Sequence, residues 1–355
     1  MKRLLFSDIH FHTWSYGATV AESGMNSRLE GQYKAAMEMV EYASEHGIRY
    51  AYFLGDLFHT HAQIPTQALW CASHVFSALR ERGILVRSIY GNHDMASRDG
   101  RFNSLEFLRR HNYEMPPYPT EANPAPKAQD YYWVDDQLKV MGVPYTNDED
   151  LLKRCFDYAD KQQEKMVMLL HQGVAGVPLS SGILLDERLS PEMIPANVIA
   201  FTGHYHFHKR VTDNLTVVGN LAAINWNDVD QKKGWVTFDD ETGEIEQIIQ
   251  QSAPEFRLVG RDNSECRNAF VRYCDAVGAA EAEEIRTRLL KDGALGVEFP
   301  EAREEGEARS FKTPTGAETT LQHLIKIYEA EQEPRRQEVG VMVREGKYEA
   351  PEVSL

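Results

Sequence analysis

Residues that can bind divalent metal ions follow short apolar runs at several separate places in the chain. They are two aspartates, one asparagine and four histidines: Asp8, His10, Asp56, Asn92, His171, His204 and His206. Two divalent ions about 3.5 to 4 Å apart can bind an attacking water and the phosphoryl oxygens of a substrate in line. Such a pair needs a bridging carboxylate together with imidazole and oxygen donors. The sequence therefore predicts a dinuclear centre for phosphoester hydrolysis.

The donor types also indicate which ions and which acid belong to this centre. A mixed nitrogen and oxygen set without thiolates favours manganese or a similar ion over a structural zinc. His93 follows Asn92 directly, so its side chain would diverge from the metal ligand and reach the leaving oxygen. A histidine can donate that proton at neutral pH, and the neighbouring Asp94 would orient it. A purely structural role for His93 is the alternative.

The elements that must position these residues are short apolar strands. In open α/β sheets, ligands lie at the carboxyl ends of the strands, so strands ending in polar residues would deliver them to one rim. Five segments have this form: Lys2 to Phe6, Tyr50 to Leu54, Leu85 to Tyr90, Met166 to Leu170 and Val198 to Phe201.

Helices and further strands complete a predicted α/β fold. Apolar residues recur at helical spacing in Arg28 to His46, Thr66 to Arg82, Asn103 to His111 and Asp148 to Gln162. Alternating segments predict strands of a second sheet packed on the first: Leu138 to Val143, Thr216 to Val218, Gly234 to Asp239 and Ile245 to Ile249. Together they predict a four-layer α-β-β-α sandwich.

The character of the sequence changes at Ser252-Ala253-Pro254, where the pattern of strands ending in polar residues stops. We expect a first domain at 1–252, a capping region at 253–312 and a terminal helix and tail at 313–355. In the tail, Thr315 and Glu318 form a capping-box pattern. An apolar stripe follows it, made of Leu321, Leu324, Ile325 and Tyr328.

Composition narrows the range of functions. The formal net charge of -16 argues against a surface that attracts nucleic acid everywhere, although bound divalent cations would invert the field locally. The four cysteines are scattered, which argues against a disulfide framework or a thiolate zinc site and indicates reduced thiols in a cytoplasmic protein. No apolar run is long enough for a signal peptide or a membrane span.

The motifs occur in the order found in the calcineurin-like metallophosphoesterase superfamily, which residues 1 to about 250 resemble. They are Asp8-Ile9-His10, Gly55-Asp56, Gly91-Asn92-His93-Asp94, His171 and Gly203-His204-Tyr205-His206. The resemblance implies that Asp8, His10 and His206 bind one ion. It also implies that Asn92, His171 and His204 bind the other, and that Asp56 lies between the two ions.

A narrower resemblance is to the SbcD-type nuclease subunit of double-strand-break repair and its phage recombination endonuclease relatives. It rests on Gly55-Asp56-Leu57-Phe58-His59 with Pro65, and on Lys233-Gly234-Trp235. It implies manganese-dependent DNA cleavage by a homodimer beside an SMC-like ABC ATPase. It also implies a catalytic, DNA-positioning role for His59, a small α+β cap and an ATPase-docking terminal helix. Phe11-His12 and Gly219-Asn220 depart from the pattern of this family.

The leading hypothesis is therefore a DNA exonuclease and endonuclease that serves DNA repair and recombination. Two alternatives remain. The same metals could hydrolyse cyclic nucleotides, other small phosphodiesters or phosphoproteins, which the acidic balance favours. The fold could also be a non-catalytic scaffold that binds protein partners. Such a protein would be expected to lack metal ligands, and none is missing from this sequence. His59 could equally be a solvated or helix-capping residue.

Overall fold

The computed structural model describes the chain except for residues 62, 98–101, 110–131, 179–188, 262–264 and 300–355. Residues 1–300 form one compact unit. The expected terminal helix and tail at 313–355 lie outside the described residues. Among the described helices, none has the length and apolarity that a bilayer crossing requires.

The first sheet has five strands in the order β11-β10-β1-β2-β3. Its parallel centre is β1 (Lys2–Phe6), β2 (Tyr50–Phe53) and β3 (Leu85–Ser88), with Leu4 opposite Ala51 and Ala51 opposite Val86. Strand β10 (Gly234–Asp239) runs antiparallel to β1, and β11 (Ile245–Ile249) runs antiparallel to β10.

The second sheet has six strands in the order β4-β5-β6-β7-β9-β8. Four of them are parallel: β5 (Val140–Val143), β6 (Met166–Leu170), β7 (Val198–Thr202) and β9 (Leu215–Val217). Antiparallel strands close both edges, namely β4 (Trp133–Asp135) and β8 (Lys209–Thr212).

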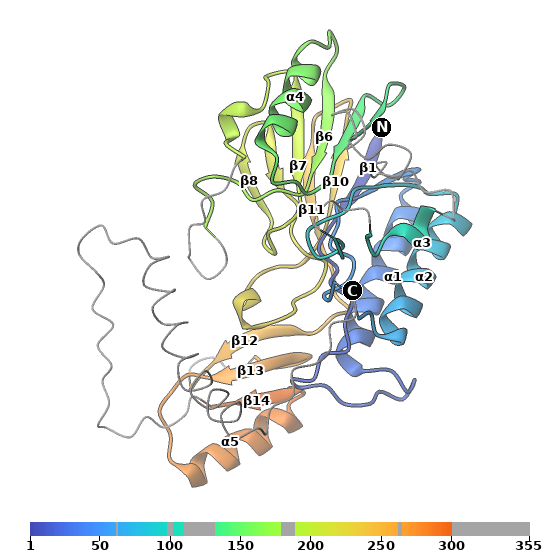
Figure 1. Cartoon of the computed structure of the whole chain (residues 1–355). Helices are drawn as coiled ribbons and strands as arrows, with labels where there is room; N and C mark the ends of the chain where they lie inside the picture. The colour runs from blue at the N-terminus through green and yellow to red at the C-terminus, as the bar shows by residue number, and fades with distance from the viewer. Residues whose placement is uncertain (62, 98–101, 110–131, 179–188, 262–264, 300–355) are drawn as a thin grey trace, which may run out of the picture. The chain divides into compact units, whose positions relative to one another are not determined.

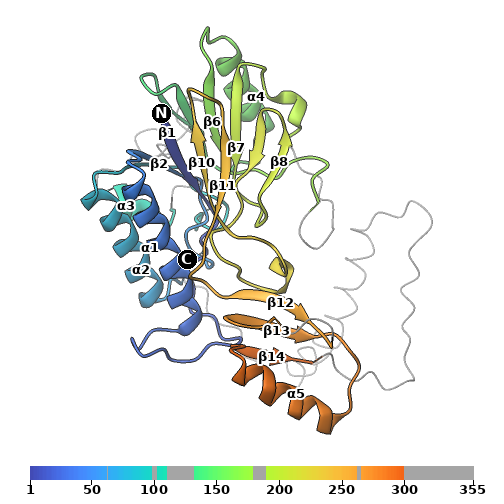
Figure 2. The ribbon, with the colours of Figure 1, turned by 180° about the vertical axis from the view of Figure 1, so that it is seen from behind.

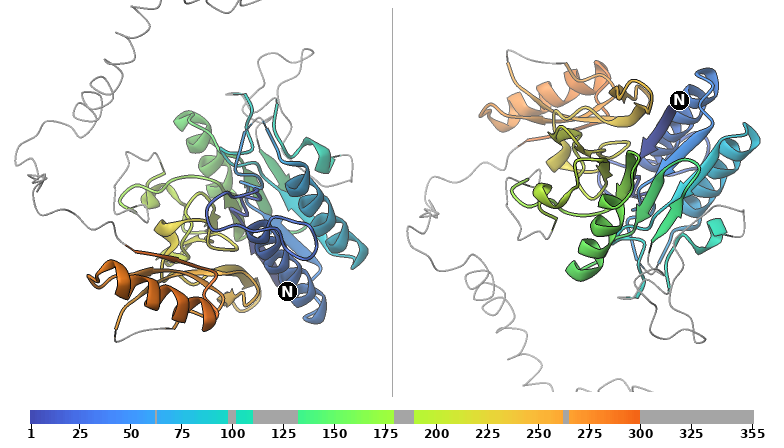
Figure 3. Two further views of the ribbon diagram at one scale, coloured as in Figure 1. Left: turned by 90° about the horizontal axis from the view of Figure 1, so that it is seen from below. Right: turned by 90° about the horizontal axis from the view of Figure 1, so that it is seen from above.

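Alternating side chains build the layers between helices and sheets. Leu4 and Phe6 of β1 pack under α1 (Ser27–Glu45) and α2 (Thr66–Glu81), whereas Leu5 faces the second sheet. The period of two along a strand sends neighbours to opposite faces. Helix α4 (Glu149–Asp160) packs on the outer face of the second sheet. The two sheets thus lie between helices, which confirms the four-layer α/β fold (Figure 1, Figure 3).

The predicted helices occur within a few residues of their expected bounds, including the short α3 (Glu106–Arg109). The sheet assignment was wrong in one respect. Gly234–Asp239 and Ile245–Ile249 extend the first sheet, and the strands that end in candidate ligands are divided between the two sheets. An alternating pattern identifies a strand, but the pairing partner depends on contacts between distant segments.

After residue 252 the chain forms a small parallel unit of β12 (Glu255–Val259), β13 (Ala269–Tyr273) and β14 (Gly296–Glu298). Helix α5 (Ala279–Lys291) connects the last two strands and packs on them (Figure 2). The parallel strands and the helix between the last two make this cap a small β-α-β arrangement. The expected boundary at residue 252 lies inside the compact unit and stays a prediction.

Two short 3-10 helices complete the described elements, η2 (Pro191–Met193) and η3 (Trp226–Asp228). Phe256 of the cap packs against Trp226 of η3, with ring centroids 4.9 Å apart. The four cysteines are free thiols, of which only Cys274 is exposed.

Candidate metal centre

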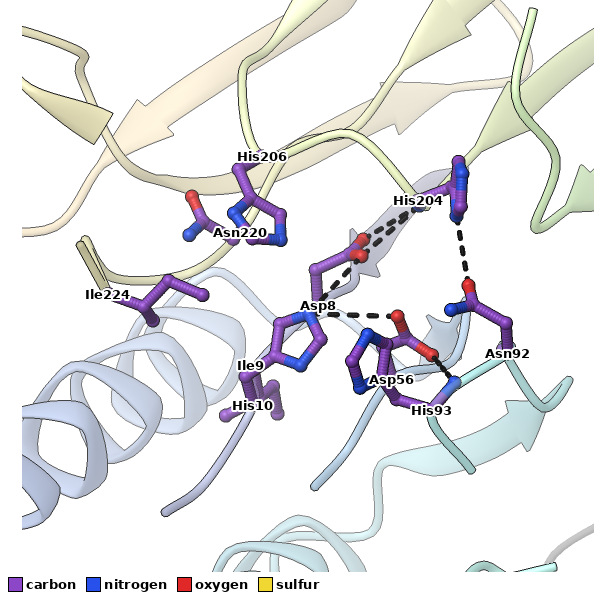
Figure 4. A network of polar contacts seen from close by, with 12 residues as sticks. Asp8, Ile9, His10, Asp56, Asn92, His93, His204, His206, Asn220 and Ile224 are labelled. Atoms are coloured by element: carbon purple, nitrogen blue, oxygen red, sulfur yellow. Dashed lines mark hydrogen bonds and ion pairs between the residues drawn. The ribbon is translucent and has the colours of Figure 1, made fainter. Parts of the chain in front are cut away.

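The candidate ligands lie in loops that follow the carboxyl ends of β1, β2, β3, β6 and β7, where the two sheets meet. The backbone brings these loops together directly. The Asp8 N–H donates to Gly55 O at 2.9 Å, and the His204 N–H donates to the two Asp8 carboxylate oxygens at 3.1 and 3.2 Å (Figure 4). Asp8, His10, Asp56 and His204 all have positive φ angles. Such strained conformations are concentrated at functional sites.

One group of candidate ligands contains Asp8, His10 and His206, whose ligand atoms all lie within 4.8 Å of one another. His10 Nε2 is 3.8 Å from Asp8 Oδ1 and 3.6 Å from Asp56 Oδ2. The structure therefore brings together the three residues expected to bind one ion.

A second group contains Asp8, Asp56 and His171, again with ligand atoms within 4.8 Å. His171 Nε2 lies 3.4 Å from Asp56 Oδ2, and Asn92 Oδ1 lies 3.2 Å from His171 Nε2 and 2.9 Å from His204 Nδ1. His171 Nδ1 donates to Leu54 O at 2.6 Å, which directs Nε2 toward the group. This bond to a carbonyl sets the tautomer that a metal ligand needs.

The electrostatics of these residues fit a divalent cation. Both ring nitrogens of the buried His10 lack a hydrogen-bond partner among the described residues, and buried polar atoms normally have one. Burial raises the pKa of Asp8 to about 6. Burial lowers the pKa of His171, but the charge of Asp56 more than offsets this and raises it. The carboxylates thus stabilise positive charge here, which a metal ion supplies.

His93 lies beside these groups and makes different contacts. Its backbone N–H donates to Asp56 Oδ1 at 2.8 Å, and its ring Nδ1 is 2.7 Å from His59 O. If Nδ1 donates to that carbonyl, Nε2 is the ring atom left to act on a substrate. The His93 ring stacks on His61 at 4.9 Å between centroids and meets the His10 ring edge-on at 4.8 Å.

His59 lies between His93 and Trp14, with ring centroids 5.6 and 4.6 Å away. Its ring is half-buried, and burial together with the charge of His93 lowers its pKa to about 4. Its Nδ1 has no hydrogen-bond partner among the described residues. The structure thus places His59 next to the candidate acid. One ring nitrogen each of His10, His59 and His93 lie within 4.8 Å of one another.

Asp94 does not orient the His93 imidazole, so that expectation was wrong. Its buried carboxylate accepts the backbone N–H groups of Asp56 and Leu57 at 2.7 and 3.0 Å, and that of Gly91 at 2.9 Å. The Ser104 hydroxyl donates to it at 3.0 Å. Asp94 therefore joins the loop after β2 to the loop after β3. The adjacent position in sequence suggested an imidazole partner, but the backbone turns this side chain inward.

Two glycines of the motifs occupy places where no side chain fits. A Cβ at Gly91 would lie 2.2 Å from Asp56 Oδ1 and 2.6 Å from His171 Cε1. A Cβ at Gly203 would lie 2.2 Å from Ser7 Oγ and 2.7 Å from His171 Nδ1. The glycines let the loops approach closely enough for their ligands to meet.

Gln32 is a site residue that the sequence reasoning missed. Its buried Nε2 donates to Ile9 O at 2.9 Å and to His10 O at 3.1 Å, and its Oε1 accepts from Trp14 Nε1 at 3.1 Å. It therefore fixes the left-handed loop after β1. The signal in the sequence was a polar residue on the apolar face of a helix, because Gln32 follows Leu29 by three positions on the core-facing side of α1.

The family match agrees with this geometry. The sequence profile of the family described as calcineurin-like phosphoesterase matches residues 1–207. The DNA double-strand break repair protein Mre11 of Methanopyrus kandleri is 24% identical over 193 residues, which are 52% of this chain and 42% of that protein. The matched segment thus spans less than half of that relative. A dimetal phosphatase from Danio rerio aligns with 67% of this chain and 91% of its own, at 14% identity and a TM-score of 0.40.

Proposed function

The chain belongs to the calcineurin-like phosphoesterase family, and on that premise we propose that it is a manganese-dependent DNA exonuclease and endonuclease. The observation that carries the hydrolase part is the clustering of Asp8 and Asp56 with His10 and His171 at one rim. The similarity to a protein named for DNA double-strand break repair supports the choice of DNA.

In this proposal the ligands divide as the family resemblance implies. Asp8, His10 and His206 would hold one ion, and Asn92, His171 and His204 would hold the other, with Asp56 contributing to both. Bound divalent ions would polarise the phosphoryl oxygens and make a water molecule more acidic at neutral pH. The orphaned ring nitrogens of His10 support this role, since a ligand histidine needs a free lone pair.

His93 acts as the general acid. With Nδ1–H donating to the His59 carbonyl at 2.7 Å, the protonated imidazolium would pass its Nε2 proton to the leaving 3′ or 5′ oxygen and become neutral. The His59 ring packs beside it and positions the DNA strand, in keeping with its place between His93 and Trp14. An aromatic face can stack on a base without regard to sequence.

The proposed assembly is a homodimer beside an SMC-like ABC ATPase, acting in DNA repair and recombination. Its support is the resemblance carried by Lys233-Gly234-Trp235 and the Phe58-His59 pair. Light scattering of the purified chain at micromolar concentration would return twice the 40.5 kDa chain mass. A mass of one chain would contradict the homodimer.

The decisive assay measures Mn²⁺-dependent cleavage of linear duplex, single-stranded, hairpin and circular DNA by the full chain. We expect cleavage that requires Mn²⁺ and disappears with chelator. A small diester, bis-p-nitrophenyl phosphate, is assayed in parallel. If the diester is hydrolysed while every DNA is left intact, with the ATPase present or absent, the hydrolase activity is supported and the nuclease proposal is wrong.

A second candidate function keeps the same metals and changes the substrate to a cyclic nucleotide or another small phosphodiester. The net charge of -16 favours it, because a strongly anionic surface repels a long polyanion more than a small one. Ranking kcat/KM for cyclic nucleotides, phosphoserine peptides and DNA separates the candidates. DNA as the poorest substrate would put this second function first.

A further inference from the structure

Lys233 is a buried cation close to the candidate metal centre. Only 3% of the residue is exposed, and its three ammonium protons have three acceptors. Its Nζ donates to Asp228 Oδ1 at 2.8 Å, to Gln231 Oε1 at 2.9 Å and to the backbone oxygen of His206 at 2.6 Å. The last bond ties this side chain directly to a proposed metal ligand.

Asp228, at the end of η3, is the partner of Lys233 and is equally buried, with 1% exposed. Its Oδ2 accepts the Ile224 N–H at 2.8 Å, which fixes the carboxylate on its own loop. Its Oδ1 lies 3.6 Å from His206 Nδ1. The carboxylate therefore faces both the lysine and one edge of the His206 ring.

His206 is thus contacted at its main chain and at its ring from the same buried pair. Because Nδ1 faces Asp228, Nε2 is the nitrogen available to the group with Asp8 and His10. Figure 4 shows the His206 ring turning its other nitrogen toward Asp8. A carboxylate on the far nitrogen of a ligand histidine is a common way to set its tautomer and orientation.

We propose that Asp228 and Lys233 are positioning residues for the metal ligand His206. Asp228 sets the orientation of the imidazole and retains the proton on Nδ1. Lys233 holds the His206 carbonyl and balances the charge of Asp228. The inference rests on the proposed metal-ligand role of His206 and gives Lys233-Gly234-Trp235, a motif without a role so far, a physical function.

A merely structural ion pair would behave differently in one respect. Removing one partner of a buried pair leaves an unpaired charge and destabilises the fold, whereas replacing both partners by neutral groups of similar size is often nearly neutral for stability. The double variant D228N/K233M therefore separates the two roles. If the pair is purely structural, the double variant regains both stability and metal affinity. If the pair positions His206, the double variant regains stability but not metal affinity.

The experiment titrates Mn²⁺ into the metal-free full chain by calorimetry and measures urea unfolding for wild type, K233M, D228N and D228N/K233M. We expect K233M to lower the unfolding midpoint and the double variant to recover it. We expect the Mn²⁺ binding phase that involves His206 to lose affinity roughly 10- to 100-fold in D228N and to stay weakened in the double variant. H206A identifies that phase, because it should remove the same one.

The matched control is Lys34→Met, which removes an exposed ion pair of the same 2.8 Å length, to Glu30, from α1. Both Mn²⁺ phases should be unchanged in it. A double variant that is as stable as wild type and binds both ions with wild-type affinity overturns this inference alone. A wild-type chain that binds no Mn²⁺ overturns the proposed function as well, so the two failures are distinguishable.

Discussion

At the residue scale, the candidate centre is defined by how differently its histidines are held. His171 is buried with Nδ1 on Leu54 O, while His10 is buried with both ring nitrogens unpartnered among the described residues. His93 instead contacts the His59 carbonyl through its ring Nδ1 and donates its backbone N–H to Asp56 Oδ1. These contacts separate residues suited to hold a cation from one suited to carry a proton.

His93→Ala should reduce cleavage of every phosphodiester substrate by about 10²- to 10⁴-fold, because leaving-group protonation is lost while the ligands stay. Calorimetry should still show two Mn²⁺ bound. Asp56→Ala should instead abolish metal binding at both proposed positions, because Asp56 is the proposed shared ligand. His46→Ala, at an exposed histidine after α1, is the matched control for activity. Loss of Mn²⁺ binding in His93→Ala would show that His93 is a ligand.

At the element scale, loops are held by residues from neighbouring elements. Asp94 joins the loops after β2 and β3, and Gln32 of α1 fixes the loop after β1. Helix α1 begins at a capped end, where the Asn26 side chain accepts the Leu29 N–H at 3.1 Å. The position of Gln32 relative to the loop is therefore set by where the helix starts.

Gln32→Leu removes that hold with little change in volume. The carbonyls of Ile9 and His10 and the indole N–H of Trp14 lose their partner in a buried place, so we expect a loss of about 1 to 3 kcal/mol in the free energy of unfolding. Urea denaturation measures it. Gln251→Leu should change stability little, because among the described residues the Gln251 side chain donates only to the exposed carbonyl of Ile249, at 3.2 Å. Equal stability of the two variants would contradict the role assigned to Gln32.

Gly91→Ala tests the close approach of the loops after β2 and β3. The added methyl would meet Asp56 and His171, so both must shift, and we expect Mn²⁺ affinity to fall at least tenfold with about 1 to 3 kcal/mol of lost stability. Gly278→Ala, at a position with open space, is the control. Wild-type Mn²⁺ affinity in Gly91→Ala would mean that the loops can separate without affecting the centre.

The same elements show how far sequence predicts such a site. The helix bounds and the strands before Asp8, Asp56 and His171 could be predicted from the pattern of apolar residues. That pattern is visible within a short stretch of sequence. The pairing of β10 with β1 depends on residues more than 200 positions apart, such as Lys2 opposite Asp239. Asp94 was assigned to the wrong partner for a related reason. Its direction depends on a turn whose geometry the residue types alone do not determine.

At the scale of the whole described unit, the centre joins the two halves of the sandwich. Asp8, His10, Asp56 and Asn92 come from loops of the first sheet, whereas the remaining candidate ligands, His171, His204 and His206, come from the second. An ion held between them adds a link across the layer of Leu5, Tyr52 and Leu169. Metal binding should therefore stabilise the entire fold and not only its loops.

Chelation gives the test of that link. A ligand that binds only the folded state adds about 2.7 kcal/mol at a hundredfold excess over its Kd, which corresponds to a melting temperature roughly 5 °C higher. We expect Mn²⁺, added after chelator has stripped the chain of metal and been removed, to raise the melting temperature by about that amount in differential scanning calorimetry. Asp56→Ala should show no such rise. If Mn²⁺ leaves the wild-type melting temperature unchanged, no cation connects the sheets, and the bridging role of Asp56 falls with it.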